Sequence, residues 1–169
     1  MALVVETGEG LAGAMSYVSV EDADKFSAYR LTWTAATQEQ KEAALVAATQ
    51  YIDIRFLRRF PGERTKSTQG LEWPRTGTQW AKNVVPPVVI RACTLYAVHA
   101  LSGPLFIVPK LSESGTAGMV TEKTVGPITK KFSAMASGYG SRVEAFGQFP
   151  DADMLMFTAF PLGCWGAIR

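Results

Sequence analysis

The chain has 169 residues, of which 47% are apolar and 19% are charged, and its net charge is +2. This composition is typical of one folded domain with an apolar core and excludes an intrinsically disordered chain. The charge is too small to indicate a nucleic-acid partner by itself. No apolar run approaches the roughly 18 residues that a membrane-spanning helix needs, and the N-terminus lacks the pattern of a signal peptide. We therefore expect no membrane partner and a reducing, cytosolic compartment.

The first third of the chain predicts a glycine-rich arm followed by two helices. Residues 1–18 are small and rich in glycine, and we expect an N-terminal arm. Ser19 can cap a helix over residues 20–31, because its side chain can accept a hydrogen bond from a free N–H group of the first turn. Thr37 starts a capping box, Thr-x-x-Gln, ahead of a long apolar run with helical period. We predict a helix over residues 38–56.

A long loop and a strongly apolar helix follow. Residues 61–84 show no clear period, and loops of this length are often functional. The Val-Pro-Pro sequence at residues 85–87 suits the start of a helix, where the N–H that proline lacks would have no partner. We predict a helix over residues 88–101 that is apolar on nearly all sides and ends before Gly103. Such a helix is buried on several sides, so we expect it at the centre of a bundle, with Cys93 as a core residue.

The last third of the chain changes character several times. β-Branched residues on both sides of Gly126-Pro127 predict a β-hairpin. A second glycine-rich stretch reads as a linker, and a short helix and an apolar end follow it. The predicted fold is mainly α (α+β), a small helical bundle around a central apolar helix with a β-hairpin and extended arms at both ends. The expected parts are an N-terminal arm (1–18), a helical core with the hairpin (19–132), and a linker with an apolar docking tail (133–169).

The residues needed for catalysis are missing from the sequence. His99 is the only histidine, the carboxylates are scattered, and there is no Walker loop, GxGxxG or CxxC motif. Cys93 and Cys164 form no metal-ligand pattern. We therefore expect no enzymatic activity, no metal and no cofactor, and a structural role for His99.

Basic residues gather around the long loop, with Phe and Trp side chains between them. One interpretation is a single-stranded DNA surface, where bases stack on aromatic rings between phosphate contacts. The others are a solvated face, and a subunit interface, where Arg and Trp are enriched. The candidate DNA-facing or interface residues are Arg55, Arg58, Arg59, Arg64, Lys66, Lys130 and Lys131.

The C-terminal segment has an unusual apolar pattern. A stripe of Met and Phe at helical spacing usually belongs to a core, but here a linker precedes it and an apolar end follows it. Exposed apolar segments of this kind mark partner sites, so we expect docking on another chain. On that interpretation, deleting residues 150–169 should leave a folded core. The candidate residues for docking on a portal or a neighbouring subunit are Met154, Leu155, Phe157, Phe160, Leu162 and Trp165.

Several short motifs occur in a fixed order along nearly the whole chain. They include the opening stretch ALVVETGEGLAGAMSYVSVEDADKF, the helix motif AALxxATxYID, the loop motif QxLxWPR, the VPP helix start, KxVGPI and FPxxDxL. This ordered set resembles a tailed-phage family that carries two descriptions. One is a head–tail adaptor, or connector, and the other is a DnaT-like single-stranded-DNA-binding protein. Within the set, the loop motif reads as structural: Gln69, Leu71, Trp73, Pro74 and Arg75.

The adaptor resemblance implies a small, mainly helical protein that forms a homo-oligomeric ring, usually dodecameric, beneath the portal. Its partners would be the portal protein and a tail terminator or stopper protein, with duplex DNA passing through the lumen. Its location would be the head–tail interface of the virion, and the host cytoplasm during assembly. The alternative, a single-strand-binding replication protein, would need the arginines and tryptophans to converge on one groove.

Overall fold

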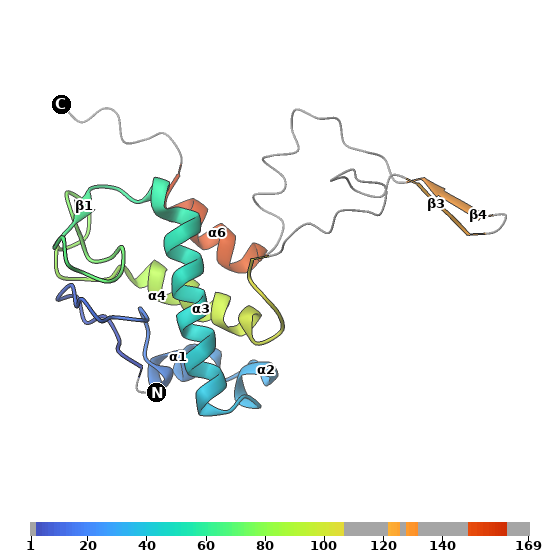
Figure 1. Cartoon of the computed structure of the whole chain (residues 1–169), viewed down its shortest axis with the longest axis horizontal. Helices are drawn as coiled ribbons and strands as arrows, with labels where there is room; N and C mark the ends of the chain where they lie inside the picture. Colours follow the sequence, from blue (N-terminus) through green and yellow to red (C-terminus); the bar gives the residue numbers. More distant parts are fainter. Residues whose placement is uncertain (1–2, 107–121, 126–127, 132–148, 162–169) are drawn as a thin grey trace. The chain divides into compact units, whose positions relative to one another are not determined.

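The computed structural model describes residues 3–106, 122–125, 128–131 and 149–161. The chain forms two units, one of Met1–Leu105 with Phe149–Arg169 and the other of Phe106–Gln148 (Figure 1). The first unit contains all the described helices. The fold is mainly α with one small antiparallel hairpin, as the sequence predicts.

The first predicted helix is split in two. α1 spans Val20–Ser27, and the side chain of Ser19 caps it by accepting a hydrogen bond from the backbone N–H of Asp22. Arg30 is extended, and the chain turns into the short helix α2, Leu31–Thr34. The break brings Trp33 into the core, where its indole N–H donates to Asp24 at 2.7 Å. This tertiary contact explains why one continuous helix to residue 31 does not form.

α3 spans Gln38–Phe56, which are the predicted bounds. Its capping box is complete: the Thr37 hydroxyl accepts from the Gln40 backbone, and the Gln40 side chain accepts from the Thr37 backbone at 2.9 Å. The 3₁₀ turn η1, Leu57–Arg59, continues the helix before Pro61 and Gly62 end the helical region. One face of α3 is buried from Ala44 to Phe56.

α4, Pro87–Ala100, is the central helix of its unit, as predicted. It packs against α1, α3 and α6, and its buried side chains between Val89 and Val98 form the middle of the core. Cys93 is fully buried, and burial raises the pKa of its thiol to about 12. The thiol is therefore a small core group rather than a nucleophile.

α6, Pro150–Ala159, packs on α4 within the same unit (Figure 1). Ala152, Met156 and Phe160 are fully buried at a spacing of four residues, which places them on one face of the helix. The segment expected to begin a docking tail is therefore a helix of the core. Deleting residues 150–169 would remove this helix, so we no longer expect that deletion to leave a folded core.

The N-terminal segment is folded rather than extended. The buried carboxylate of Glu6 accepts hydrogen bonds from the backbone N–H groups of Gly8, Gly10 and Leu11 at 2.8–2.9 Å. The backbone N–H of Gly70 donates to the carbonyl of Leu11 at 3.0 Å. These bonds close the glycine-rich arm on itself and hold it against the long loop.

The long loop contains a two-residue ladder that the sequence did not predict. β1, Glu63–Arg64, pairs antiparallel with β2, Arg75–Thr76. Gly62 precedes the ladder with φ +64, and a Cβ there would lie 1.8 Å from the carbonyl oxygen of Thr76. Only glycine fits at this position.

The second unit contains the predicted hairpin. β3, Glu122–Val125, and β4, Ile128–Lys131, are antiparallel, with Val125 opposite Ile128. The expected linker over residues 133–148 lies outside the described residues.

Candidate functional site

The loop motif around Trp73 is held by side chains that bind backbone groups. The Gln69 amide donates to the carbonyls of Leu71 and Pro74 at 2.7 and 3.1 Å, and its oxygen accepts from the backbone N–H of Lys66 at 2.9 Å. Gln69 is buried, so these bonds satisfy a polar group that would otherwise be costly to bury. The peptide bond between Trp73 and Pro74 is cis.

Arg75 has the same kind of role in β2. Its guanidinium donates to the carbonyls of Pro61 and Gly62 at 2.8 and 2.7 Å, and it pairs with the Glu72 carboxylate at 2.7 Å. The side chain is buried, and its donors are directed at these acceptors. Arg75 therefore fixes the loop, in agreement with the structural role that we expected for this motif.

Trp73 lies at the centre of an aromatic cluster. Its ring is fully buried, and the ring centroids of Phe60, Trp80 and Phe160 lie 5.6, 5.5 and 5.9 Å away. Trp80 is half-buried, whereas Phe60 and Phe160 are buried. Because Phe160 follows α6, the cluster joins the long loop to the C-terminal helix. Neither Trp73 nor Phe60 offers a face on which a base could stack.

Two further polar residues, the buried Tyr17 and the half-buried Asp53, connect the N-terminal arm, α3 and the loop. The Tyr17 hydroxyl donates to the Asp53 carboxylate and accepts from the backbone N–H of Trp73 at 3.2 Å. The backbone N–H of Glu72 also donates to Asp53, at 3.2 Å. Burial raises the pKa of Asp53 to about 7 and raises that of Tyr17 well above its usual value. Tyr17 and Asp53 belong to two of the ordered motifs, the opening stretch and AALxxATxYID, but the sequence does not show that the two side chains are paired.

The raised pKa of Asp53 predicts a pH-dependent stability. Because the pKa is about 7 in the folded protein and 3.8 ordinarily, the folded state holds the proton more tightly. The resulting stabilisation is fully present below about pH 4 and is lost as the pH rises through 7. The loss lowers the free energy of unfolding by at most about 4 kcal/mol. Urea unfolding of wild type and Asp53→Asn between pH 5 and pH 8 measures how the free energy of unfolding depends on pH.

The asparagine variant should show a shallower fall in the free energy of unfolding over that range. Asp22→Asn is the matched control, because Asp22 is exposed and its pKa is lowered by Lys25 and Ser19. Equal slopes for wild type and Asp53→Asn would contradict the assignment.

The structure separates the candidate basic residues into two groups. Arg55 and Arg59 face α6: Arg55 pairs with the buried carboxylate of Asp153 at 3.4 Å, and Arg59 donates to the carbonyl of Phe160 at 3.2 Å. The Arg59 guanidinium also lies 4.3 Å from the ring centroid of Phe157. These two arginines hold the C-terminal helix and are not free for phosphate contacts.

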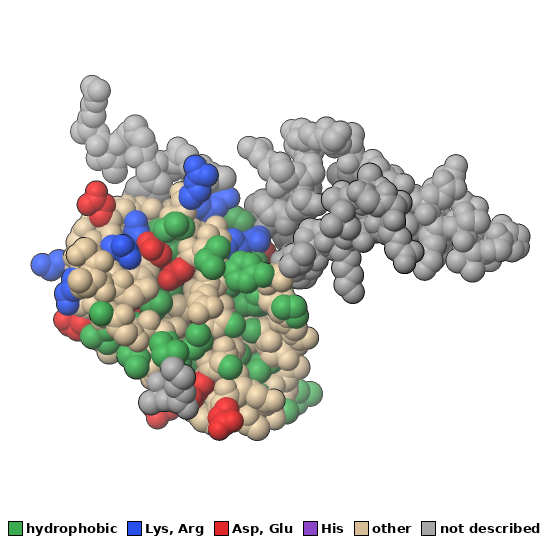
Figure 2. Space-filling view, viewed as in Figure 1, with side chains coloured by type: hydrophobic (Ala, Val, Ile, Leu, Met, Phe, Trp, Pro, Cys, Tyr) green, Lys and Arg blue, Asp and Glu red, His purple; other side chains and the backbone are tan. Residues whose placement is uncertain are grey.

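Three other residues of the candidate basic set are exposed. Arg58, Arg64 and Lys66 lie on the surface of η1 and the long loop, where Lys and Arg side chains gather with acidic side chains between them (Figure 2). The Lys66 ammonium donates to the carbonyl of Glu9. Lys130 and Lys131 belong to β4, and their side chains lie outside the described residues.

The candidate docking residues are also divided. Met154 is exposed, Leu155 and Phe157 are half-buried, and Phe160 is buried in the aromatic cluster. Phe160 therefore holds the chain's own core together, contrary to its expected place on a docking surface. Leu162 and Trp165 lie outside the described residues.

His99 joins the end of α4 to the start of α6, which agrees with the expected structural role. Its Nε2 lies 2.8 Å from the Asp151 carboxylate, which also pairs with Arg30 at 3.1 Å. Partial burial raises the pKa of Asp151, but the hydrogen bonds and charges of His99 and Arg30 outweigh this effect and lower it.

Among the described residues, no group of three or more His, Cys, Asp or Glu side chains could hold a metal ion. None of the helices in the described part of the chain combines the length and the apolar character needed to cross a membrane.

Comparison with known proteins gives one finding. A family model described as "Putative DnaT-like ssDNA binding protein" matches residues 1–166. No curated protein and no solved structure matches the chain significantly.

Proposed function

The chain belongs to the family described as "Putative DnaT-like ssDNA binding protein", and within it we propose a structural, non-enzymatic role as a head–tail adaptor of a tailed phage. In this role, copies of the chain form a ring beneath the portal, and a tail terminator or stopper protein binds on the other side. Duplex DNA passes through the lumen. The protein acts in the virion, after assembly in the host cytoplasm.

The observation that carries this choice is the burial of Trp73 and Phe60 in the aromatic cluster. A single-strand binder stacks bases on accessible aromatic rings beside phosphate contacts. Here the rings pack on one another, and Arg55 and Arg59 bind α6. These two rings and two arginines, which suggested a stacking surface in the sequence, instead stabilise the fold.

Two further features support an adaptor. The motifs of the opening, α3, the loop, the α4 start and α6 occur in the order of the tailed-phage family that the sequence resembles, one description of which is a head–tail adaptor. The described basic residues that remain exposed are interspersed with carboxylates, which favours weak contact with duplex DNA. Strong phosphate contacts would hinder DNA passage, because each neutralised phosphate adds affinity.

Negative-stain imaging of the protein mixed with the portal protein of the same phage tests the proposal. We expect a ring stacked on the portal. Absence of association at high protein concentration would contradict it.

Deletion of residues 162–169 is the sharper test of the tail, because it leaves α6 and Phe160 in place. We expect an unchanged melting temperature and at least about tenfold weaker portal binding, since an apolar segment buried on a partner contributes several kcal/mol. If the truncated chain bound the portal as tightly as wild type, residues 162–169 would not be part of the docking surface. Met154→Ser is the companion variant, because Met154 is exposed on α6.

The family description itself favours a second candidate, single-stranded DNA binding. Fluorescence anisotropy with a labelled oligonucleotide across a salt series tests it with the free protein. The adaptor proposal expects weak binding that salt abolishes. Tight binding that Arg58→Glu with Arg64→Glu reduces, while the melting temperature stays constant, would favour the single-strand binder.

A further inference from the structure

α3 has a second apolar face, opposite the one that packs on α4. Ala43, Val46, Ala47 and Ile54 lie on this outer face together with Gln50, and Leu57 of η1 follows them; Ile54 is 66% exposed. A helix that is apolar on both sides is normally covered on both sides. Of the described residues, those of the N-terminal arm cover part of the outer face, and Ile54 and Leu57 remain exposed.

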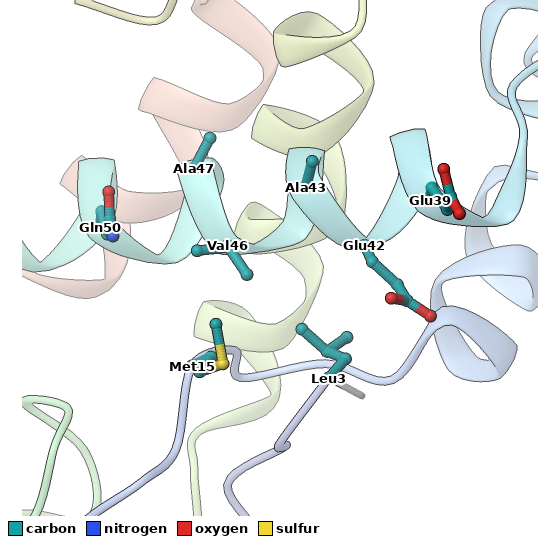
Figure 3. A pocket seen from close by; sticks show the side chains of 8 residues that line it. All are labelled: Leu3, Met15, Glu39, Glu42, Ala43, Val46, Ala47 and Gln50. Carbon is teal, nitrogen blue, oxygen red and sulfur yellow. The ribbon is translucent and has the colours of Figure 1, made fainter. Parts of the chain in front are cut away.

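A groove runs between the arm and the N-terminal half of α3. It has a volume of about 550 Å³, and Leu3 and Met15 of the arm form the wall opposite Val46 (Figure 3). Glu39 and Glu42 lie at one end. Glu42 accepts a hydrogen bond from Gln38 at 3.0 Å, and neither carboxylate forms an ion pair with any described residue. The groove is thus apolar with an acidic end.

A different surface of the same unit has protruding apolar side chains and a positive charge, in contrast to the apolar groove with its acidic end. Around the turn between α1 and α2, Tyr29 and Leu31 are 73% and 84% exposed, and Phe26 is also exposed. Phe26 and Tyr29 line a shallow pocket with Arg91 and Leu95 of α4. Arg91 is exposed and forms no ion pair with the described residues. This surface consists of protruding apolar side chains beside an unpaired cation.

We propose that the α1–α2 turn of one copy docks in the α3 groove of the next copy, with Arg91 facing Glu39 and Glu42. The apolar protrusions match an apolar groove, and the unpaired charges are of opposite sign. The two surfaces share no residue, so the contact is heterologous, and repeating it generates a closed ring or an open filament. The inference rests on the proposed ring and identifies its subunit interface.

A charge swap tests the contact. Glu42→Arg and Arg91→Glu should each raise the concentration of half-assembly by about tenfold or more, because each places like charges opposite one another. The double variant should restore assembly, which a purely local effect on either helix would not do. Sedimentation velocity of the full chain, with and without the portal protein, measures assembly.

Glu63→Arg and Lys82→Glu are the matched controls, because they change the same charges at exposed positions outside both surfaces. Leu31→Ser tests the apolar part, and its high exposure means that the fold should be unaffected. If wild type forms rings and all these variants assemble like it, this interface is wrong and the adaptor function stands. If wild type associates neither with itself nor with the portal, the adaptor function fails as well.

Discussion

Replacing Asp153 with alanine is expected to lower the free energy of unfolding by about 3–5 kcal/mol, the usual cost of removing one member of a buried ion pair. Asp153 is fully buried in α6. It accepts a hydrogen bond from the Tyr96 hydroxyl at 2.5 Å and pairs with Arg55 at 3.4 Å, and the Phe149 backbone N–H donates to it. Burial is the main cause that raises the pKa of Tyr96 well above its usual value, and the hydrogen bond to the Asp153 carboxylate adds to it.

The alanine variant leaves the Tyr96 hydroxyl and the Arg55 charge without this acceptor in the interior. Urea unfolding followed by circular dichroism measures the effect. Asp151→Ala is the matched control on the same helix, because its ion pairs with Arg30 and His99 are at the surface and should contribute about 1 kcal/mol or less. Equal losses in the two variants would show that Asp153 does not hold α6 in the way described.

Trp73→Ala should cost about 3–5 kcal/mol, the range for truncating a large buried aromatic side chain. The substitution opens a cavity at the point where Phe60, Trp80 and Phe160 meet, so the loop and α6 should loosen together. Thermal unfolding and near-ultraviolet circular dichroism report the two effects.

Trp73→Phe should recover part of the loss by refilling the cavity. Leu57→Ala is the control, because Leu57 is largely exposed and should change the stability by less than about 0.5 kcal/mol. An unchanged melting temperature for Trp73→Ala would place the ring on the surface. That result would revive the stacking interpretation, in which Trp73 contacts bases.

The parts of the fold that local chemistry determines could be predicted from the sequence. The bounds of α3 follow from the capping box at Thr37 and from the Pro61-Gly62 stop, and the start of α4 follows from its proline pair. The hairpin follows from β-branched residues around a Gly-Pro turn. The split between α1 and α2 could not be predicted in this way, because it depends on the hydrogen bond from Trp33 in α2 to Asp24 in α1.

The candidate site was harder to predict, because the sequence does not show which way a long side chain points. Arg55 and Arg58 are three residues apart, yet one binds α6 and the other faces solvent. The spacing of Ala152, Met156 and Phe160 fits a core helix as well as a docking helix. The preceding glycine-rich stretch favoured the docking interpretation, and only the packing on α4 corrected it.

The contact between His99 and Asp151 has a consequence for how the chain can vary. It joins the end of α4 to the start of α6, so the two ends of the helical unit between which residues 106–148 are inserted lie close together. The number of residues inserted between these two ends can therefore change without moving the helices, since each doubling in the length of a connecting segment costs only about 0.6 kcal/mol. Related chains could therefore carry inserts of very different size and sequence on the same helical unit, each matched to its own neighbours.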